Sequence, residues 1–545
     1  MTTGDRAWLR VTILFAVMTV AATWPQIIQP AGIPPHRDAW LNMWRVAWVA
    51  HQLPRDPIRL FDANIHYPER GTLAYSDATL VQGLLASPPL WVGIPTPYVH
   101  TALVLVSFVF AGVSAWALVR RLTDSNLAGM VAGIVFAFTP YRFDHYMHLE
   151  LLWTGWMPLT LLAVHEAVER GALKSGVTAG LLFAAQGLSC IYYGVFFGTV
   201  LAVMTVVLIA GRPLADVRRA ALALGCGAAL AGVLLFAYFA PYRAARDTVG
   251  ERTEGEALIY SAGPAHYLAS TPENFLYGRF ADRLGRPEKR LFPGIIAVTL
   301  AAVGLWPPLT RRRVAYLAGW LLAVDLSFGP NGLTFPWLRE YVLPFRGLRV
   351  PARAGGVSIL MIAVLAGAGW ARFEQNRRWR VRALSWPLAA LVLAALALEY
   401  VAIPQTLIAA PTVASPVYEW LGRQQGAVIE LPMPDEHALP GYDAEFMYQS
   451  TFHWLPLVNG YSGNVPDSYV EVLRHMRGFP SDAGIGLLRG IGVRYVVVHE
   501  RLYGSNRYRE VTSALDARSD IVKKQSFGHA GDQVSVYSPT AAIHD

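Results

Sequence analysis

The sequence predicts a polytopic α-helical membrane protein of about eleven transmembrane helices, followed by a small C-terminal α/β domain outside the membrane. Of its 545 residues, 54% are hydrophobic and only 15% are charged, whereas ordinary soluble domains carry about 25% charged residues. Apolar runs of about 20 residues, long enough to cross a bilayer, recur through the first 410 residues. These observations exclude a soluble enzyme and a disordered chain. The two cysteines lie in apolar runs, which also excludes a disulfide scaffold.

The first apolar run, 8–29, has no cleavage site of small residues after it, so we expect an uncleaved first span. The chain then offers further runs that we interpret as spans. They are 98–119, 126–140, 149–168, 173–190, 192–210, 220–240, 291–309, 314–329, 354–370 and 384–403.

The loops between these runs alternate in character. Short basic loops at 120–121, 169–174, 212–219, 311–313 and 372–382 are expected in the cytoplasm by the positive-inside rule, together with the N-terminus. Long loops rich in Asp, His, Tyr and Pro are expected outside: 30–97, 141–150, 241–290 and 330–353. This distribution explains much of the net charge of +8 without nucleic acid as a partner.

The last part of the chain has a different composition. Residues 427–431, 495–498 and 533–537 are apolar runs of strand length, and 417–423 and 468–476 have helical patterns. We therefore expect a membrane domain at 1–410 and an extracytoplasmic α/β domain at 411–545.

The large outer loop, 30–97, contains two notable aspartates. Asp38 begins an amphipathic helix in which Trp40, Trp44 and Trp48 recur four residues apart, a spacing typical of a helix lying at the membrane interface. A carboxylate at this N-terminal end is favoured by the helix dipole. Asp77 precedes the next expected helix, near residue 78. For both aspartates the alternative interpretation is a helix N-cap.

Arginines lie at the outer ends of several spans, against the positive-inside rule. Because the guanidinium group binds phosphate oxygens in a bidentate manner, we interpret them as ligands of a lipid phosphate. They are Arg142, Arg243, Arg346, Arg349 and Arg353. The last three are spaced to share one helical face. The alternative is pairing with acids such as Asp247 or Glu340 and with lipid headgroups.

Two further sets of residues are candidate substrate contacts. The first set is His148 and Glu150, which lie in the second outer loop with Asp144 and His145. A divalent metal at His145 and His148 stays an open alternative, and no other cofactor is expected. In the C-terminal domain, aromatic and amide side chains suit a sugar, although Asn459-Gly460 is also a good turn. These residues are His453, Trp454 and Asn459.

Several segments along most of the chain resemble the glycosyltransferase-C superfamily, within it a poorly assigned group of bacterial multi-spanning proteins. The segments are His36-Arg-Asp-Ala-Trp, Asn64-Ile-His-Tyr-Pro, Phe138-Thr-Pro-Tyr-Arg with His148, Leu268-Ala-Ser-Thr-Pro-Glu-Asn, Leu348-Arg-Val-Pro-Ala-Arg-Ala-Gly and His453-Trp-Leu-Pro-Leu-Val-Asn-Gly-Tyr-Ser-Gly. The resemblance implies sugar transfer from a polyprenyl-phosphate carrier at the outer membrane face, with Asp38 as general base. Many relatives carry two adjacent acids at this point, whereas here Asp38 stands alone.

The leading hypothesis is thus an inverting glycosyltransferase of a bacterial cytoplasmic membrane, transferring a hexose or pentose to a glycan, lipid or protein acceptor. Asp38 would act as the base and Asp77, His148, Glu150, His453, Trp454 and Asn459 would bind substrate. The alternatives are a transporter or flippase for a lipid-linked saccharide, and an assembly factor whose outer domain binds polysaccharide. Transporters often carry inverted repeats and broken helices at the bilayer midplane, which the sequence does not show clearly.

Overall fold

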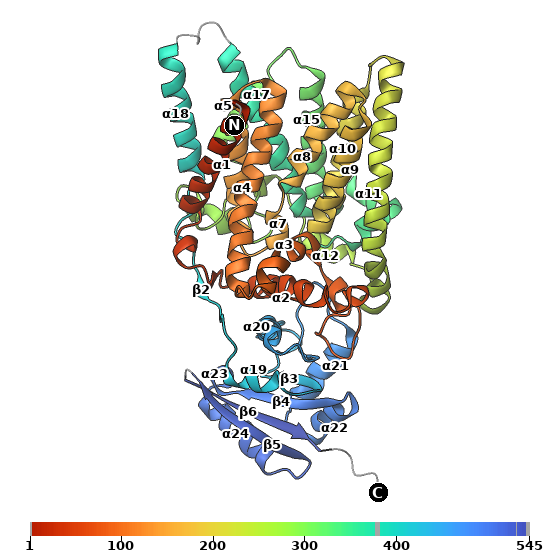
Figure 1. Cartoon of the computed structure of the whole chain (residues 1–545), viewed down its shortest axis with the longest axis vertical. Helices are drawn as coiled ribbons and strands as arrows, with labels where there is room; N and C mark the ends of the chain where they lie inside the picture. Colours follow the sequence, from red (N-terminus) through yellow and green to blue (C-terminus); the bar gives the residue numbers. More distant parts are fainter. Residues whose placement is uncertain (1–2, 376–381, 530, 541–545) are drawn as a thin grey trace. The chain divides into compact units, whose positions relative to one another are not determined.

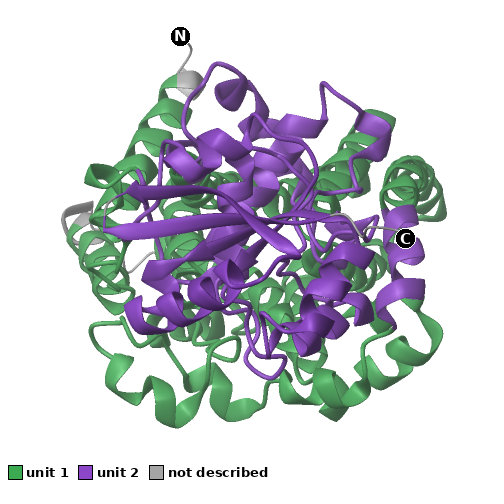
Figure 2. Cartoon of the chain, turned by 90° about the horizontal axis from the view of Figure 1, so that it is seen from below, with its two compact units in different colours: residues 1–30, 101–238, 251–407 green, residues 31–100, 239–250, 408–545 purple. Residues whose placement is uncertain are grey.

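The computed structural model describes residues 3–375, 382–529 and 531–540, which are mostly helical. Packing divides the chain into two compact units, coloured separately in Figure 2. Unit 1 comprises residues 1–30, 101–238 and 251–407, and unit 2 comprises 31–100, 239–250 and 408–545. The structure thus groups the outer loop after the first helix with the C-terminal segment, whereas composition alone places a boundary only at residue 410.

Unit 1 is built almost entirely of helices. They are α1 (Thr3–Ala22), α5 (Asn126–Phe138), α6 (Pro140–Asp144), α7 (Leu149–Leu152), α8 (Trp156–Arg170), α9 (Leu173–Ser189), α10 (Ile191–Ile209), α12 (Glu254–Ile259), α13 (Ala281–Leu284), α14 (Ile295–Gly304), α15 (Arg311–Ser327), α16 (Phe335–Tyr341), α17 (Gly355–Gln375) and α18 (Arg382–Glu399), with most of α4 (Thr96–Thr123) and α11 (Leu214–Val249). Figure 1 shows the long ones running in roughly one direction.

Among the residues that the structure describes, four helices are long and apolar enough to cross a membrane, which indicates a membrane protein: Thr96–Thr123, Ile191–Ile209, Leu214–Val249 and Pro351–Gln375. Most of the other expected spans form shorter helices. In the run 291–309 only α14 forms, and Pro307 and Pro308 lie shortly after its end, where they cannot continue a helix. Most of the expected basic loop 372–382 lies outside the described residues.

Small residues bring two helices of unit 1 very close together. A Cβ added at Gly176 or Gly180 of α9 would lie 1.9 or 2.0 Å from the carbonyl oxygen of Ala223 or Gly227 on α11. Only glycine permits this approach of two backbones, the kind of contact that small residues make between membrane helices.

Unit 2 combines helices with two small sheets. Its elements are β1 (Gly32–Ile33), α2 (Arg37–Gln52), α3 (Leu80–Trp91), β2 (Ile408–Ala409), α19 (Pro416–Leu421), β3 (Ala427–Leu431), α20 (Asp443–Gln449), α21 (Asp467–Met476), α22 (Asp482–Gly490), β4 (Val493–His499), α23 (Glu500–Tyr503), α24 (Ser505–Asp516), β5 (Ile521–His529) and β6 (Asp532–Pro539). The larger sheet has the order β3-β4-β6-β5; β3 and β4 are parallel, and β6 is antiparallel to both of its neighbours.

The three predicted strands of the C-terminal domain are confirmed as β3, β4 and β6, which supply part of the buried apolar side chains of its core. The sequence did not indicate β5. Most residues of β5 are exposed because it is an edge strand of the sheet, so it lacks the apolar pattern of a buried strand.

Candidate functional site

Asp38 lies in the first turn of α2 and is held there from two sides. Its carboxylate Oδ1 accepts a hydrogen bond of 2.8 Å from the hydroxyl of Tyr461, and its Oδ2 lies 3.4 Å from the ring Nδ1 of His36. The N-cap residue is His36, whose ring accepts from the backbone N–H of Asp38. The N-cap interpretation of Asp38 is therefore wrong. The side chain stays 17% exposed, so a substrate hydroxyl could reach it.

The tryptophan face of α2 packs inside unit 2. Trp44 and Trp48 are 1% and 5% exposed, and the Trp48 ring lies 5.8 Å from that of Trp454. The Trp454 ring in turn stacks on the His51 ring, with 4.0 Å between the ring centres. The backbone φ of Trp454 is 57°, a value that is rare for a bulky residue. Trp48, a ring that we expected at the membrane interface, thus joins the outer loop to the C-terminal segment.

The other predicted site residues of the outer loop and of α11 are placed differently from their expectation. Asp77 is buried, and α3 begins only at Leu80 with Thr79 as its N-cap residue, so Asp77 is not the N-cap. Arg243 is exposed on α11. It does not begin an irregular loop, because α11 continues through Pro241 to Val249.

Asn459 is fully buried, and its amide forms hydrogen bonds with Glu430 and Asp443. Its Oδ1 accepts from the N–H of Glu430 at 2.7 Å, and its Nδ2 donates at 3.0 Å to the carbonyl of Glu430 and to Oδ1 of Asp443. His453 is also buried, its ring Nδ1 accepts from the N–H of Leu455, and burial lowers its pKa to about 3. These contacts give both residues a structural role, and their part in binding substrate stays a prediction.

In unit 1, Arg142 closes the turn around α7. Its guanidinium group donates to Oγ1 of Thr154 at 2.8 Å and to the carbonyl of Leu152 at 2.9 Å, and it lies 4.6 Å from the centre of the Phe108 ring. The side chain is 3% exposed. Its two Nη atoms therefore donate to protein groups, and its part in binding phosphate stays a prediction.

The three arginines before α17 do not share one helical face. Pro344 and Pro351 divide the segment into short 3-10 turns, Leu343–Gly347 and Pro351–Ala354, with extended backbone between them. The guanidinium group of Arg349 lies 5.3 Å from the centre of the Tyr260 ring. The helical spacing was therefore the wrong geometry for this segment, because proline at these positions removes the backbone N–H that a continuous helix needs.

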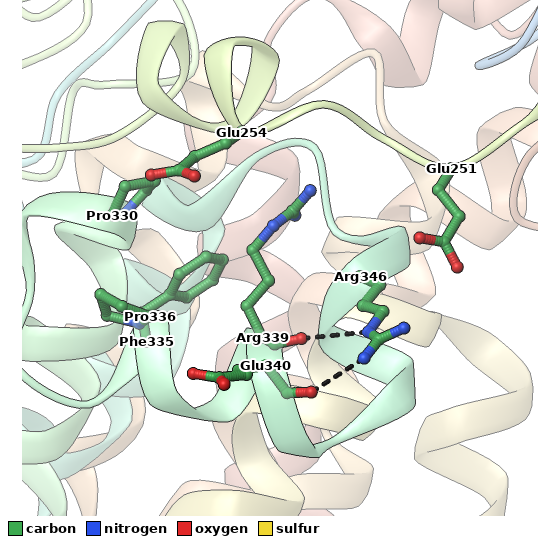
Figure 3. A pocket seen from close by; sticks show the side chains of 8 residues that line it. All are labelled: Glu251, Glu254, Pro330, Phe335, Pro336, Arg339, Glu340 and Arg346. Atoms are coloured by element: carbon green, nitrogen blue, oxygen red, sulfur yellow. Dashed lines mark hydrogen bonds between the residues drawn. The ribbon is translucent and has the colours of Figure 1, made fainter.

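Arg346 lines a cavity of about 400 Å³ (Figure 3). Its guanidinium group donates to the backbone carbonyls of Arg339, at 3.3 Å, and Glu340, at 2.9 Å. Arg339 lines the same cavity and has a buried Nη1 without a hydrogen bond in the described part of the chain. Neither arginine forms an ion pair there with a carboxylate, although Glu251, Glu254 and Glu340 also line the cavity.

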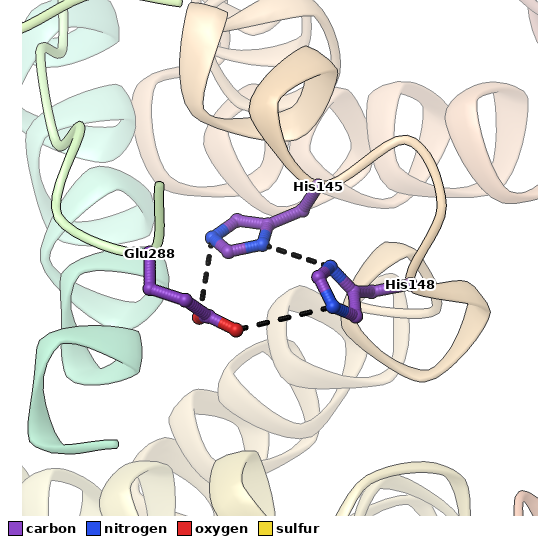
Figure 4. Close-up of side chains that lie close together, drawn as sticks. All are labelled: His145, His148 and Glu288. Atoms are coloured by element: carbon purple, nitrogen blue, oxygen red, sulfur yellow. Dashed lines mark hydrogen bonds and ion pairs between the residues drawn. The ribbon is translucent and has the colours of Figure 1, made fainter. Parts of the chain in front are cut away.

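His145, His148 and Glu288 lie close together (Figure 4), and Arg353 forms an ion pair with Glu288. Arg353 donates to both carboxylate oxygens of Glu288, at 3.0 and 2.5 Å. The Nδ1 atoms of the two histidines are 3.2 Å apart, and their Nε2 atoms lie 4.0 and 3.9 Å from the two oxygens of Glu288. Burial lowers the pKa of His145 to about 3; it would raise the pKa of Glu288, but Arg353 reverses this and keeps the carboxyl ionised.

A second ion pair borders this cluster. Arg290 donates to Asp144 at 2.7 Å, both side chains are buried, and burial raises the pKa of Asp144 to about 6 against the effect of Arg290. Glu150, also buried, lies in the first turn of α7, and His148 is the N-cap residue of that helix.

Sequence reasoning missed Glu288 and Tyr461 as site residues. Glu288 stands in a charged stretch, Glu288-Lys289-Arg290, immediately before an apolar run, and this contrast was its only signal. Tyr461 lies inside a segment singled out for the resemblance, but nothing in the sequence pairs it with Asp38. A comparison with protein-family models finds no matching family, and one with curated proteins finds no match.

Proposed function

We propose that this chain is an integral membrane glycosyltransferase that uses a polyprenyl-phosphate sugar as its donor. The proposal includes about eleven spans in a bacterial cytoplasmic membrane, a cytoplasmic N-terminus and an outer face that carries the site. The acceptor is a glycan, lipid or protein.

One observation carries the proposal. Arg346 and Arg339 line a cavity without carboxylate partners in the residues that the structure describes, and the bonds of Arg346 go to backbone carbonyls. The alternative role of Arg346 was an ion pair with an acid such as Glu340. Arg346 contacts only the backbone oxygen of Glu340, and not its carboxylate. Guanidinium groups without a carboxylate partner in such a cavity suit a phosphate. The carboxylates that line it can accept hydrogen bonds from sugar hydroxyls.

The reaction assigns separate roles to the remaining residues. Asp38 accepts the proton of the acceptor hydroxyl as its oxygen attacks the anomeric carbon, and the bond from that carbon to the phosphate oxygen breaks with inversion. The polyprenyl phosphate leaves with the bonding electrons, and arginine side chains stabilise its charge. Tyr461 holds the Asp38 carboxylate in place through its hydroxyl.

The test uses the full chain in lipid nanodiscs, undecaprenyl phosphate linked to a radiolabelled hexose or pentose, and bacterial envelope extract as the acceptor source. Asp38→Asn is expected to lower transfer about 100- to 10,000-fold, the usual contribution of a general base. Asp56→Asn is the matched control, because Asp56 lies in the same loop and caps a short helix that Asn also caps well. Equal activity in both variants would remove Asp38 as the base.

Arg346→Gln separates donor binding from acid–base chemistry. It should raise KM for the donor, whereas Tyr461→Phe should lower kcat with little change in KM, because Tyr461 acts through Asp38. Movement of the labelled lipid across the bilayer without sugar transfer would instead support the transporter alternative.

A further inference from the structure

We propose that His145, His148 and Glu288 form a binding site for one divalent transition-metal ion of the zinc class. The three residues each offer one ligand atom, and these atoms all lie within 4.8 Å of one another. Figure 4 shows the two rings and the carboxylate pointing toward one another. This site contains no residue of the outer loop 30–97 and does not depend on the proposed sugar transfer.

The distances between the two imidazoles and Glu288 fit a shared metal ion better than they fit direct hydrogen bonds. The Nε2 atoms of His145 and His148 lie 4.0 and 3.9 Å from the oxygens of Glu288, beyond hydrogen-bond range. Two ligands bound tetrahedrally at about 2.1 Å from one metal ion stand about 3.4 Å apart. A small inward movement of the side chains would therefore bring all three to ligand distance.

An unsatisfied atom gives independent support. Nε2 of His145 is buried without a hydrogen bond among the described residues, and the side chain is only 1% exposed. A buried polar atom without a partner costs about 1–3 kcal/mol. A metal ion at this point would remove that cost, and Glu288 would supply negative charge.

Arg353 does not block the site. Its two hydrogen bonds to Glu288 use one side of the carboxylate, at 3.0 and 2.5 Å. An ionised carboxylate has about four lone-pair positions, so it can bind an ion as well. Arg353 then orients the ligating carboxylate, as partners of metal ligands commonly do. Imidazole nitrogens favour zinc-class ions over Mg²⁺ and Ca²⁺, which prefer oxygen ligands.

The contact between the two rings must change when both bind an ion. At 3.2 Å one Nδ1 donates to the other, so the accepting neutral ring carries its proton on Nε2, toward Glu288. Ligation through both Nε2 atoms therefore opens this contact and moves that proton to Nδ1 of the accepting ring, so both histidines bind as neutral imidazoles with no net release of a proton.

The experiment uses the full chain in nanodiscs, purified without a histidine tag, stripped with a chelator and titrated with Co²⁺ and with Zn²⁺. The wild type should bind one Co²⁺ with the visible absorption of a tetrahedral site, and Zn²⁺ should raise its melting temperature. His148→Gln should abolish stoichiometric binding, and Arg353→Lys should lower affinity about 10- to 100-fold.

His437→Gln is the matched control, because this histidine side chain is 83% exposed and should not contribute to binding. If a variant fails to fold, the rise in the melting temperature of the wild type on adding Zn²⁺ still tests the proposal. A folded wild type that takes up no stoichiometric ion would overturn the proposal, as would His148→Gln binding Co²⁺ like the wild type.

Discussion

Two buried histidine–carboxylate clusters, one in each unit, use similar residues in opposite ways. In unit 2, Nε2 of His499 lies 2.7 Å from Glu430 and its Nδ1 lies 3.5 Å from Asp532. Burial opposes protonation of His499, but hydrogen bonds to Asp532 and Glu430 raise its pKa to about 9. In unit 1 the imidazole–carboxylate gaps are 3.9 and 4.0 Å, and Arg353 supplies the positive charge beside Glu288.

The difference shows that the source of the cation decides what a buried histidine can do. Where two carboxylates share one imidazole, the histidine is itself the cation and the cluster closes as an ion pair. Where an arginine already neutralises the carboxylate, the histidine stays neutral and keeps a lone pair for a ligand. The same residue types therefore give a structural link between β3, β4 and β6 in one unit and a candidate metal site in the other.

The largest expected effect is the loss of the cation in the closed cluster. His499→Leu leaves Glu430, which is fully buried, without its positive partner and removes the imidazolium from Asp532. Removing one partner of a buried pair costs about 3–5 kcal/mol, so this variant should lower the free energy of unfolding by that amount. Pulse proteolysis of the full chain measures the change.

His437→Leu serves as the control, since an exposed surface pair contributes about 0–1 kcal/mol. If His499→Leu is no less stable than this control, the closed cluster is not an ion pair that stabilises the sheet.

The two clusters should respond to pH in opposite directions. The folded pKa of His499, about 9, exceeds its ordinary value of 6.5, so its stabilisation is fully present below pH 6.5 and is lost as the pH rises through 9. The loss amounts to about 3 kcal/mol. The pKa of His145 is lowered to about 3, so unit 1 should lose stability as the pH falls from 6.5 toward 3, because the unfolded chain then binds the proton.

Hydrogen exchange, corrected for the intrinsic effect of pH, distinguishes these responses by segment. Protection of β3 and β4 should decline at alkaline pH, and protection around His145 and His148 at acidic pH. A parallel decline in both segments at the same pH would remove the distinction between the clusters.

The smallest expected effect concerns a neutral partner of the closed cluster. The hydroxyl of Tyr418 donates to Glu430 at 2.7 Å. Tyr418→Phe removes this bond and keeps the ring, so it should cost about 1.5–3 kcal/mol, the usual contribution of a hydrogen bond to a charged group. Thermal unfolding of Tyr418→Phe and of His499→Leu, measured side by side, shows which variant loses more stability. A larger loss of stability in Tyr418→Phe would mean that the hydroxyl, and not the imidazolium, chiefly stabilises Glu430.

The candidate site could be predicted from the sequence only where one residue carries its own signal. Asp38 stands out locally as a carboxylate at the start of an amphipathic helix, but its role as general base is what the resemblance implies; its pairing with Tyr461 was not predicted, because 423 residues separate the two. Likewise His145 and His148 are neighbours in the sequence, whereas Glu288 and Arg353 reach them only through folding. The expected alignment of Arg346, Arg349 and Arg353 was wrong because Pro344 and Pro351 stand at the starts of two separate short 3-10 turns.

Local composition and periodicity were enough to predict a mostly helical membrane protein and the three buried strands of a C-terminal sheet, because burial in lipid or in a core leaves a pattern along the chain. The exposed edge strand β5 carries no such pattern. Only the tertiary structure decided which distant polar groups meet, and hence which histidine is charged and which is neutral. Burial and the distance to a charged partner set the pKa of a histidine, and neither can be predicted from its neighbours in the sequence.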